Sequence, residues 1–219
     1  MKKRILFFII LFIIVLLGST VYGIMLNEQN YSGLDFGDMA KRKVLYFKHP
    51  KNVATEDEQI EFIQEISKLT KEEAVYLIEE CNKKELDLFV VLGLIRVESN
   101  FDTMTVGTHG ERGLGQLMAN TAKPLAKNLG IKYEPNSLFK PKYNIFLFTT
   151  QLQYLSKVLN GDIHKILTAY NRGEYGLKRY MASRGHRINP AESTYSHKVL
   201  HYKNKYYKQF KEEYLSYWQ

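Results

Sequence analysis

Glu98 is the residue of this sequence best placed to donate a proton. It lies near the end of a long apolar run, residues 86–99, which is rich in Leu, Val, Phe and Ile. A carboxyl group at such a place is partly removed from water, and this desolvation raises its pKa. A carboxylic acid that stays protonated near neutral pH can serve as a general acid, for example toward the oxygen of a glycosidic bond. By itself the position is not specific, because most glutamates at helix ends are solvated.

Two later segments carry side chains suited to a polar ligand. Residues 101–116 contain glycines at 107, 110, 113 and 115, and backbone without a β-carbon can approach a bulky sugar closely. Gln116 carries an amide that can both donate and accept hydrogen bonds. Tyr170 offers a flat apolar ring with a polar tip, and the neighbouring Asn171 offers a second amide. Both residue types suit the recognition of amino sugars.

The chain resembles the soluble lytic transglycosylase family, the goose-type branch of the lysozyme-like fold, over about residues 86–205. A single Glu-Ser pair would carry no weight, but four blocks occur in the family's order with plausible spacing. They are Glu98-Ser99, the run Gly113-Leu114-Gly115-Gln116-Leu117-Met118 with Thr121-Ala122, the run Ala169-Tyr170-Asn171-Arg172-Gly173, and Tyr195 ahead of Lys198-Val199-Leu200.

This resemblance implies a mainly α, lysozyme-like domain that cleaves the glycan strands of peptidoglycan. Glu98 would protonate the oxygen that joins N-acetylmuramic acid to N-acetylglucosamine and then act as a base, and Tyr195 would hydrogen-bond it. The 6-hydroxyl of the muramic acid would attack its own anomeric carbon and leave a 1,6-anhydro end, so positioning replaces a second carboxylate. No metal or cofactor is implied. Substrate contacts are implied for Ser99, Gly113, Gln116, Met118, Tyr170 and Asn171.

Three residues depart from the family pattern. Gly115 stands in place of a methionine, so we expect one apolar wall of the cleft to be missing. Glu111 replaces a small residue and Glu174 replaces a proline, and both changes could alter the shape of the subsites. None of the three changes removes the acid at Glu98.

Two other functions stay open. A glycosidase that uses water needs two carboxylates, about 5–5.5 Å or about 6.5–9.5 Å apart. Asp102 follows Glu98 too closely to face it easily across a sugar, whereas Glu111 in the glycine-rich loop could reach, so a hydrolytic muramidase is an alternative. A catalytically silent wall-binding module of an envelope-spanning apparatus is another. Asn171 could also cap a helix that begins near Glu174 instead of contacting a ligand.

Helical periodicity dominates from Glu58 onward, and no segment alternates convincingly as a strand does. Thr70 and Glu73 have the spacing of a capping box, which predicts a helix that reaches about Lys84. The apolar run that ends at Ser99 is long enough for a buried central helix, and residues 101–116 predict a loop. Further helices are expected at about 121–129, 144–159, 162–170, 174–183 and 194–213.

The N-terminus has the pattern of a membrane anchor. Residues 5–26 carry no charge, and at 1.5 Å per residue they would span roughly 33 Å, enough for a hydrocarbon core of about 30 Å. Lys2, Lys3 and Arg4 precede them, which predicts a single-pass inner-membrane protein with a cytoplasmic N-terminus and an extracytoplasmic, periplasmic domain. A cleaved signal peptide is the rival interpretation. Residues 1–26 would then be the anchor, 27–57 a spacer and 58–219 the catalytic domain.

The composition is that of a globular protein with a net charge of +8, which favours anionic partners such as wall polymer or lipid headgroups. No zinc-finger or ribonucleoprotein motif accompanies this charge, so nucleic acid is not an expected partner. The six histidines show no metal-ligand spacing. Cys81 is the only cysteine, which excludes an intrachain disulfide, and its place on an apolar helical stripe predicts a buried core residue.

The C-terminal segment 201–219 is basic and aromatic. Its Tyr202, Tyr206 and Phe210 recur every four residues, so they form one stripe of a helix. Such a stripe more often packs on its own domain than on a partner, and protein partners in an envelope complex stay open.

Overall fold

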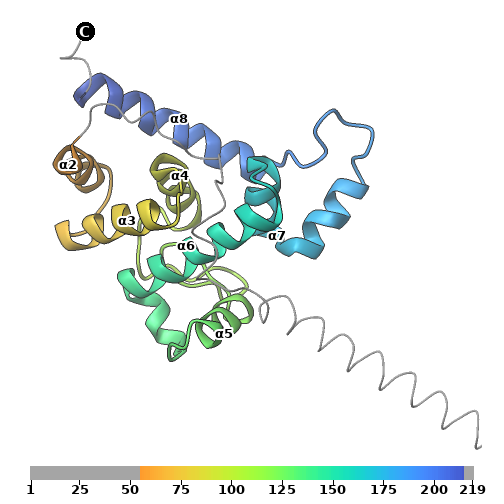
Figure 1. Ribbon diagram of the computed structural model, residues 1–219, viewed down its shortest axis with the longest axis horizontal. Coiled ribbons are helices and arrows are strands. Elements are labelled where there is room, and N and C mark those ends of the chain that lie inside the picture. Colours follow the sequence, from red (N-terminus) through yellow and green to blue (C-terminus); the bar gives the residue numbers. More distant parts are fainter. Residues whose placement is uncertain (1–54, 215–219) are drawn as a thin grey trace, which may run out of the picture.

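The computed structural model describes residues 55–214, which fold into the mainly α-helical domain that the sequence predicts (Figure 1). In this part of the chain, sheet structure is limited to isolated bridges between Val106 and Arg112 and between Arg112 and Leu117. The elements are α2 (Glu56–Ile66), α3 (Lys71–Lys83), α4 (Leu88–Glu98), α5 (Ala119–Asn128), the 3-10 helix η2 (Pro135–Phe139), α6 (Pro141–Val158), α7 (Ile163–Ala182) and α8 (Thr194–Tyr214).

Side-chain caps fix the starts of the first three helices. Thr55 caps α2, and Thr70 forms the predicted capping box of α3, in which its side chain and that of Glu73 each accept the other's backbone N–H. Asp87 accepts the N–H groups of Phe89 and Val90 at 2.8 and 3.3 Å and so starts α4. These caps satisfy N–H groups that no helical carbonyl can reach.

α4 is the central helix of the domain, as its apolar sequence predicts. Every residue from Leu88 to Ile95 is buried, and the principal partner of α4 is α8, which runs along one side of the domain (Figure 1). The two helices approach closely at Gly93, where a β-carbon would lie 2.5 Å from the carbonyl oxygen of Val199 and 3.0 Å from the backbone nitrogen of Lys203. The glycine therefore sets the distance between the two helices.

The aromatic stripe of α8 packs on its own domain. For residues up to 214, this confirms the interpretation that the sequence pattern favours over packing on a partner. Tyr206 and Phe210 are buried. The ring of Phe210 lies 5.2 Å from that of Phe62 in α2 and 5.4 Å from that of Phe89 in α4, measured between centroids. These are the separations of interacting aromatic pairs, so α8 joins α2 to α4.

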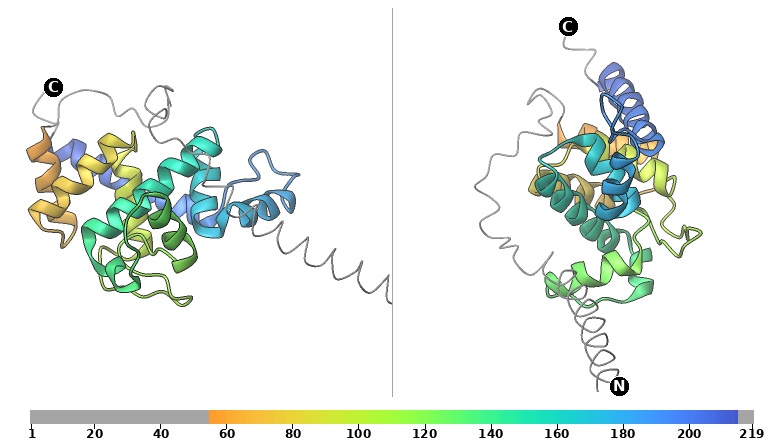
Figure 2. Two further views of the ribbon diagram at one scale, coloured as in Figure 1. Left: turned by 60° about the horizontal axis from the view of Figure 1, so that its bottom comes forward. Right: turned by 90° about the vertical axis from the view of Figure 1, so that its right-hand side faces the viewer.

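Some boundaries differ from the expectations. α5 and α6 begin two or three residues early, and α6 does so because Pro141 occupies its first turn, where the fixed φ of proline suits a helix start. The short helix η2 was not expected. The two helices predicted at 162–170 and 174–183 are confirmed as two helical segments within α7, separated at Gly173, where the backbone is not helical and φ is 71°. Glycine adopts this backbone conformation without the steric cost of a β-carbon. The segment between α7 and α8 projects from the domain (Figure 2).

The predicted anchor, residues 5–26, and nearly all of the predicted spacer, residues 27–57, lie outside the described residues. Helix α2 begins two residues before the predicted start of the domain. Within residues 55–214, no helix is both long enough and apolar enough to cross a membrane.

Gly93→Ala is expected to destabilise the domain by about 1–3 kcal/mol, even though alanine favours a helix more than glycine does. The physical reason is that the new methyl group would meet backbone atoms of α8, which cannot rotate away. Equilibrium urea denaturation of the full chain in mild detergent measures the change. Gly185→Ala is the matched control, because the nearest atom there would be the carbonyl oxygen of Ala182 at 4.0 Å. Equal stability of the two variants would contradict the close packing of α4 on α8.

Candidate active site

The carboxyl group of Glu98 and the hydroxyl group of Tyr195 are hydrogen-bonded across two helices. Glu98 is the last residue of α4, Tyr195 is the second residue of α8, and Tyr195 Oη donates to Glu98 Oε1. Burial raises the pKa of Glu98 from 4.5 to about 7; the hydrogen bond from Tyr195 lowers it and the negative charge of Glu111 raises it. The sequence predicted this pair, and the structure brings it together.

A buried polar network holds the start of α8, and hence Tyr195, in place. Ser193 and Ser196 exchange hydrogen bonds in which each side-chain hydroxyl accepts the other's backbone N–H, at 3.0 and 3.1 Å. The hydroxyl of Thr168 in α7 donates to the carbonyl oxygen of Ala191 at 2.8 Å and lies 2.8 Å from that of Ser193. Because buried polar groups are costly to leave unpaired, this network fixes the segment tightly. Its residues carried no recognisable signal in the sequence.

The glycine-rich loop is anchored on α6 by Asn144, a residue that the sequence did not single out. Its side chain is fully buried and makes three hydrogen bonds to backbone. The amide nitrogen donates to the carbonyl oxygens of Arg112 (2.9 Å) and Leu138 (2.8 Å), and the amide oxygen accepts the N–H of Gly115 at 2.8 Å. An asparagine within an apolar helix was the only hint available in the sequence.

Ser99 joins the same loop to the end of α4. Its buried hydroxyl donates to the carbonyl oxygen of Leu114 at 2.9 Å, within the motif that contains Gln116. The sequence predicted that Ser99 contacts substrate, and that contact stays a prediction. Its burial and its backbone partner give it a different task, which is to hold the loop against the end of α4.

Gln116 is fixed in the loop with its amide nitrogen already occupied. Both N–H bonds are used, one to the carbonyl oxygen of Thr105 at 3.0 Å and one to that of Gly113 at 2.8 Å. An amide nitrogen has only two hydrogens, so the expected donor role toward a ligand is not available in this arrangement. The amide oxygen remains as an acceptor.

Gly113 and Gly115 are needed for packing inside the protein. Gly113 has a φ of 74°, and a β-carbon there would overlap the carbonyl oxygen of Leu138. At Gly115 a β-carbon would lie 2.6 Å from two ring carbons of the fully buried Phe148. Phe148 therefore occupies the space that a side chain at position 115 would need, and the missing cleft wall stays a prediction.

Tyr170 connects α7 to the loop and lies close to the acid. Its hydroxyl donates to the carbonyl oxygen of Gly115 at 2.7 Å. Burial, and after it the charge of Glu98, raise the pKa of Tyr170 well above its usual value. The half-buried ring of Tyr170 is thus tied to the segment that carries Gln116 and lies within reach of the charge of Glu98.

Met118 and Asn171 are the two predicted substrate-contact residues that are exposed to solvent. Met118 is exposed and precedes the first residue of α5, and Asn171 is exposed on α7 before the kink. The side chain of Asn171 makes no hydrogen bond to any residue between 55 and 214, so the alternative in which it caps a helix is not observed. Glu174, which stands in place of a proline, accepts a hydrogen bond from Tyr154 of α6 at 2.9 Å.

Glu111 is the second carboxylate near the acid. It lies in the loop, and backbone N–H groups, its own and that of His109, lower its pKa, aided by the charge of His109. Its negative charge raises the pKa of Glu98. The carboxylate of Asp102 accepts the N–H of Met104 at 2.9 Å. The site therefore holds one carboxyl with a raised pKa and one with a lowered pKa.

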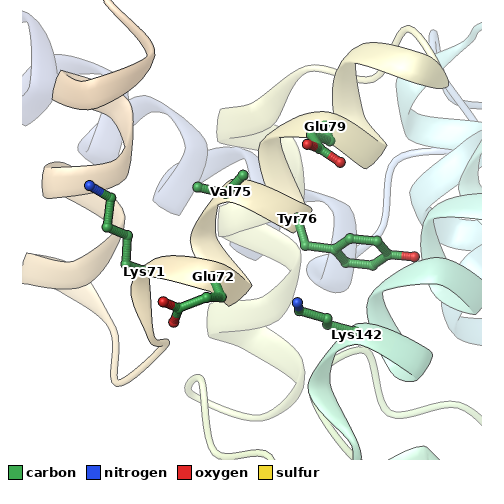
Figure 3. A pocket seen from close by; sticks show the side chains of 6 residues that line it. All are labelled: Lys71, Glu72, Val75, Tyr76, Glu79 and Lys142. Carbon is green, nitrogen blue, oxygen red and sulfur yellow. The ribbon is translucent and has the colours of Figure 1, made fainter.

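No metal-ligand cluster is found in the part of the chain that the structure describes, since no three His, Cys, Asp or Glu side chains gather there suitably. Cys81 is buried, and its burial raises the pKa of the thiol, as expected for a core residue. A hollow of about 320 Å³ lies between α3 and the start of α6. Figure 3 shows the six side chains that line it. The hollow is lined by Lys71, Glu72, Val75, Tyr76, Glu79 and Lys142. None of the residues described around Glu98 belongs to this lining.

Comparison with known proteins decides the family. Residues 75–195, more than half of the chain, match the family model described as the transglycosylase SLT domain. The chain belongs to the SLT transglycosylase family. This confirms the resemblance found in the four sequence blocks around Glu98.

Individual relatives of this SLT chain are similar over part of its length. A Haemophilus influenzae protein described as a soluble lytic murein transglycosylase is 33% identical over 92 residues, which are 42% of this chain and 16% of that protein. The 70 kDa soluble lytic transglycosylase of Escherichia coli is 24% identical with a TM-score of 0.56, and covers 64% of this chain and 24% of its own. An inactive mutant of lytic transglycosylase Slt from Pseudomonas aeruginosa is 23% identical with a TM-score of 0.53, over 61% of this chain and 23% of its own. The two structures show that the fold is shared, and the chain spans a quarter or less of the length of each of these proteins.

Glu98→Gln is expected to make the SLT domain more stable at pH 8, by about 2–3 kcal/mol, while leaving its stability at pH 4 nearly unchanged. In the unfolded chain the carboxyl ionises above about pH 4.5, whereas in the fold it stays protonated until about pH 7. Stability of the natural protein therefore falls between these two pH values, and the uncharged glutamine avoids that loss. Urea denaturation at both pH values measures it. The control is Glu79→Gln on the exposed side of α3, for which no such pH-dependent gain is expected. An equal gain at pH 4 and pH 8 would show that ionisation of Glu98 is not its cause.

Proposed function

We propose that this chain is a lytic transglycosylase, which cleaves peptidoglycan between N-acetylmuramic acid and N-acetylglucosamine and leaves 1,6-anhydro ends. The proposal rests above all on the half-buried carboxyl of Glu98, which has a pKa of about 7 and accepts a hydrogen bond from Tyr195. Membership of the SLT family and the name of the Haemophilus influenzae relative, a murein transglycosylase, support the same substrate.

Glu98 acts first as an acid and then as a base. Its proton passes to the bridging oxygen, and the bond from that oxygen to C1 of the muramic acid breaks, with the electron pair staying on the oxygen. The 6-hydroxyl oxygen of the same sugar then bonds to C1 and gives its proton to Glu98, which returns to its acid form. Because nucleophile and electrophile belong to one sugar, the second step depends on orientation.

Tyr195 is a positioning residue in this scheme. Its hydroxyl donates to Oε1 of Glu98, so the acidic proton of Glu98 resides on the other oxygen, Oε2, which is left to face the glycosidic bond. Tyr170 and the acceptor oxygen of Gln116 are proposed to contact the sugars next to the acid. Ser99 and Gly113 keep the loop in place, and the exposed Met118 and Asn171 are proposed to contact sugars further along the strand.

Glu98→Gln should reduce release of glycan fragments from purified peptidoglycan by at least about 100-fold, because the amide cannot donate a proton to the leaving oxygen. The natural chain should lose activity as pH rises through about 7, since the acid form of Glu98 is lost there. Mass spectrometry of the fragments measures both effects, and ends with 1,6-anhydro groups are lighter than reducing ends by one water.

Glu79→Gln again serves as the control and should release fragments at the rate of the natural chain. Undiminished release by Glu98→Gln would refute the assignment of the acid. A natural chain that binds peptidoglycan but releases nothing would favour the alternative of a silent wall-binding module.

We also propose that residues 1–26 anchor the chain in the inner membrane, with residues 27–57 as a spacer and the catalytic domain 58–219 in the periplasm, where peptidoglycan lies. The uncharged length of residues 5–26 and the preceding Lys2, Lys3 and Arg4 support this topology.

Cell fractionation without detergent should find the full chain in the membrane fraction, and a chain that lacks residues 1–26 in the soluble fraction. The physical reason is that an apolar helix long enough to cross the hydrocarbon core does not leave it spontaneously. A full chain of unaltered mass in the soluble fraction would reject the anchor, and a shortened chain there would favour the cleaved signal peptide.

A further inference from the structure

We propose that Glu111 is a second catalytic carboxylate, which holds a water molecule together with Gln116 and lets the enzyme form hydrolysed glycan ends beside anhydro ends. The inference rests on the proposed function, because it concerns the step that follows proton donation by Glu98. It assigns a chemical role to a side chain for which the anhydro reaction has no use.

The oxygens of Glu111 and Gln116 are neighbours across the glycine-rich loop. A β-carbon at Gly107 would lie 2.8 Å from Gln116 Oε1 and would overlap Glu111 Oε2, so both oxygens border the same point. They are therefore at most about 5 Å apart, a span that one water can bridge with two hydrogen bonds of about 2.8 Å each. The loop is held in this shape by the N–H of Gly107, which donates to the carbonyl oxygen of Glu111 at 2.8 Å.

Both neighbours are acceptors, which suits a water molecule. The two N–H bonds of Gln116 are spent on the carbonyl oxygens of Thr105 and Gly113, so its amide presents only oxygen. The Glu111 carboxylate likewise accepts and does not donate. A water that donates one hydrogen to each is left with its lone pairs directed away from the loop.

The charges of the two carboxyl groups are those of an acid and a base. Backbone N–H groups and His109, whose Nδ1 lies 3.5 Å from Glu111 Oε1, favour the ionised form of Glu111. Burial favours the protonated form of Glu98, and the charge of Glu111 adds to that effect. Environments that separate two carboxyl pKa values in this way define which group donates and which accepts a proton.

The hydrolytic step balances with these two groups and water alone. Glu98 gives its proton to the bridging oxygen, and the bond from C1 to that oxygen breaks with the electron pair moving to the oxygen. The oxygen of the bound water bonds to C1, and one water proton passes to Glu111. Proton exchange with solvent then restores protonated Glu98 and ionised Glu111. Water and the 6-hydroxyl thus compete for the same carbon.

The test counts two kinds of new ends on glycan strands whose original reducing ends have been removed with borohydride. Every new reducing end then arises from hydrolysis, and every anhydro end from intramolecular attack. The full natural chain is expected to form both. Glu111→Gln should lower the ratio of reducing to anhydro ends by about tenfold or more, because the amide cannot take a proton from water. The ratio is independent of the total activity that a variant retains.

Asp102→Asn is the matched control, because it removes the same charge from the same loop while its amide oxygen can still accept the N–H of Met104. Its ratio should stay within about twofold of the natural value, since the carboxylate of Asp102 is bound to the backbone N–H of Met104 and takes no part in the proposed water site. A second readout is the pH profile of anhydro-end formation. Loss of the Glu111 charge lowers the pKa of Glu98, so the decline in activity at high pH should begin at lower pH in Glu111→Gln and not in Asp102→Asn.

Glu111→Asp, which keeps the charge on a shorter side chain, should give a ratio between those of the natural chain and Glu111→Gln. Anhydro ends alone from the natural chain, or an unchanged ratio in Glu111→Gln, would overturn the role of Glu111 and leave that of Glu98 intact. Continued cleavage by Glu98→Gln would instead overturn the proposed function, and this inference with it.

Discussion

The hydrogen bond from Tyr195 to Glu98 is the interaction on which the site depends. It joins the last residue of α4 to the second residue of α8, so it exists only if these helices pack at a fixed distance and register. Gly93 provides the distance, because any side chain there would meet the backbone of α8. The aromatic contacts of Phe210 with α2 and α4 hold the far end of α8. The position of the Glu98 carboxyl relative to Tyr195 therefore depends on the packing of the whole helical core.

The glycine-rich loop gains its rigidity from helices that surround it. Ser99 just after α4, Asn144 from α6 and Tyr170 from α7 each hydrogen-bond to backbone groups between residues 112 and 115. A loop without regular structure would otherwise adopt many conformations, and these hydrogen bonds select one of them. The result is a preorganised surface beside the acid, in which even the side chain of Gln116 is directed by its own loop.

The site keeps a carboxyl group where its charge is unfavourable. Burial raises the pKa of Glu98 to about 7, and Glu111 adds a negative charge nearby instead of a compensating positive one. Such an arrangement costs folding stability above the pKa of a free carboxyl, and it is maintained by the packing of α4 and α8. A feature that opposes stability but prepares a proton donor is typical of active sites.

The sequence by itself determined the mainly helical class, the capping box at Thr70, the buried helix that ends at Glu98, and the family, because these depend on local periodicity and on motifs. Tertiary structure decided the rest. Asn144 anchors the loop by hydrogen bonds to its backbone, and the amide N–H bonds of Gln116 are used by backbone carbonyl groups of the same loop. Phe148 occupies the space that a side chain at Gly115 would need. The sequence could not show these outcomes, because each depends on which backbone groups long-range packing leaves without a partner. Local pattern specifies which side chains are present, and packing across distant segments specifies which of their atoms remain free.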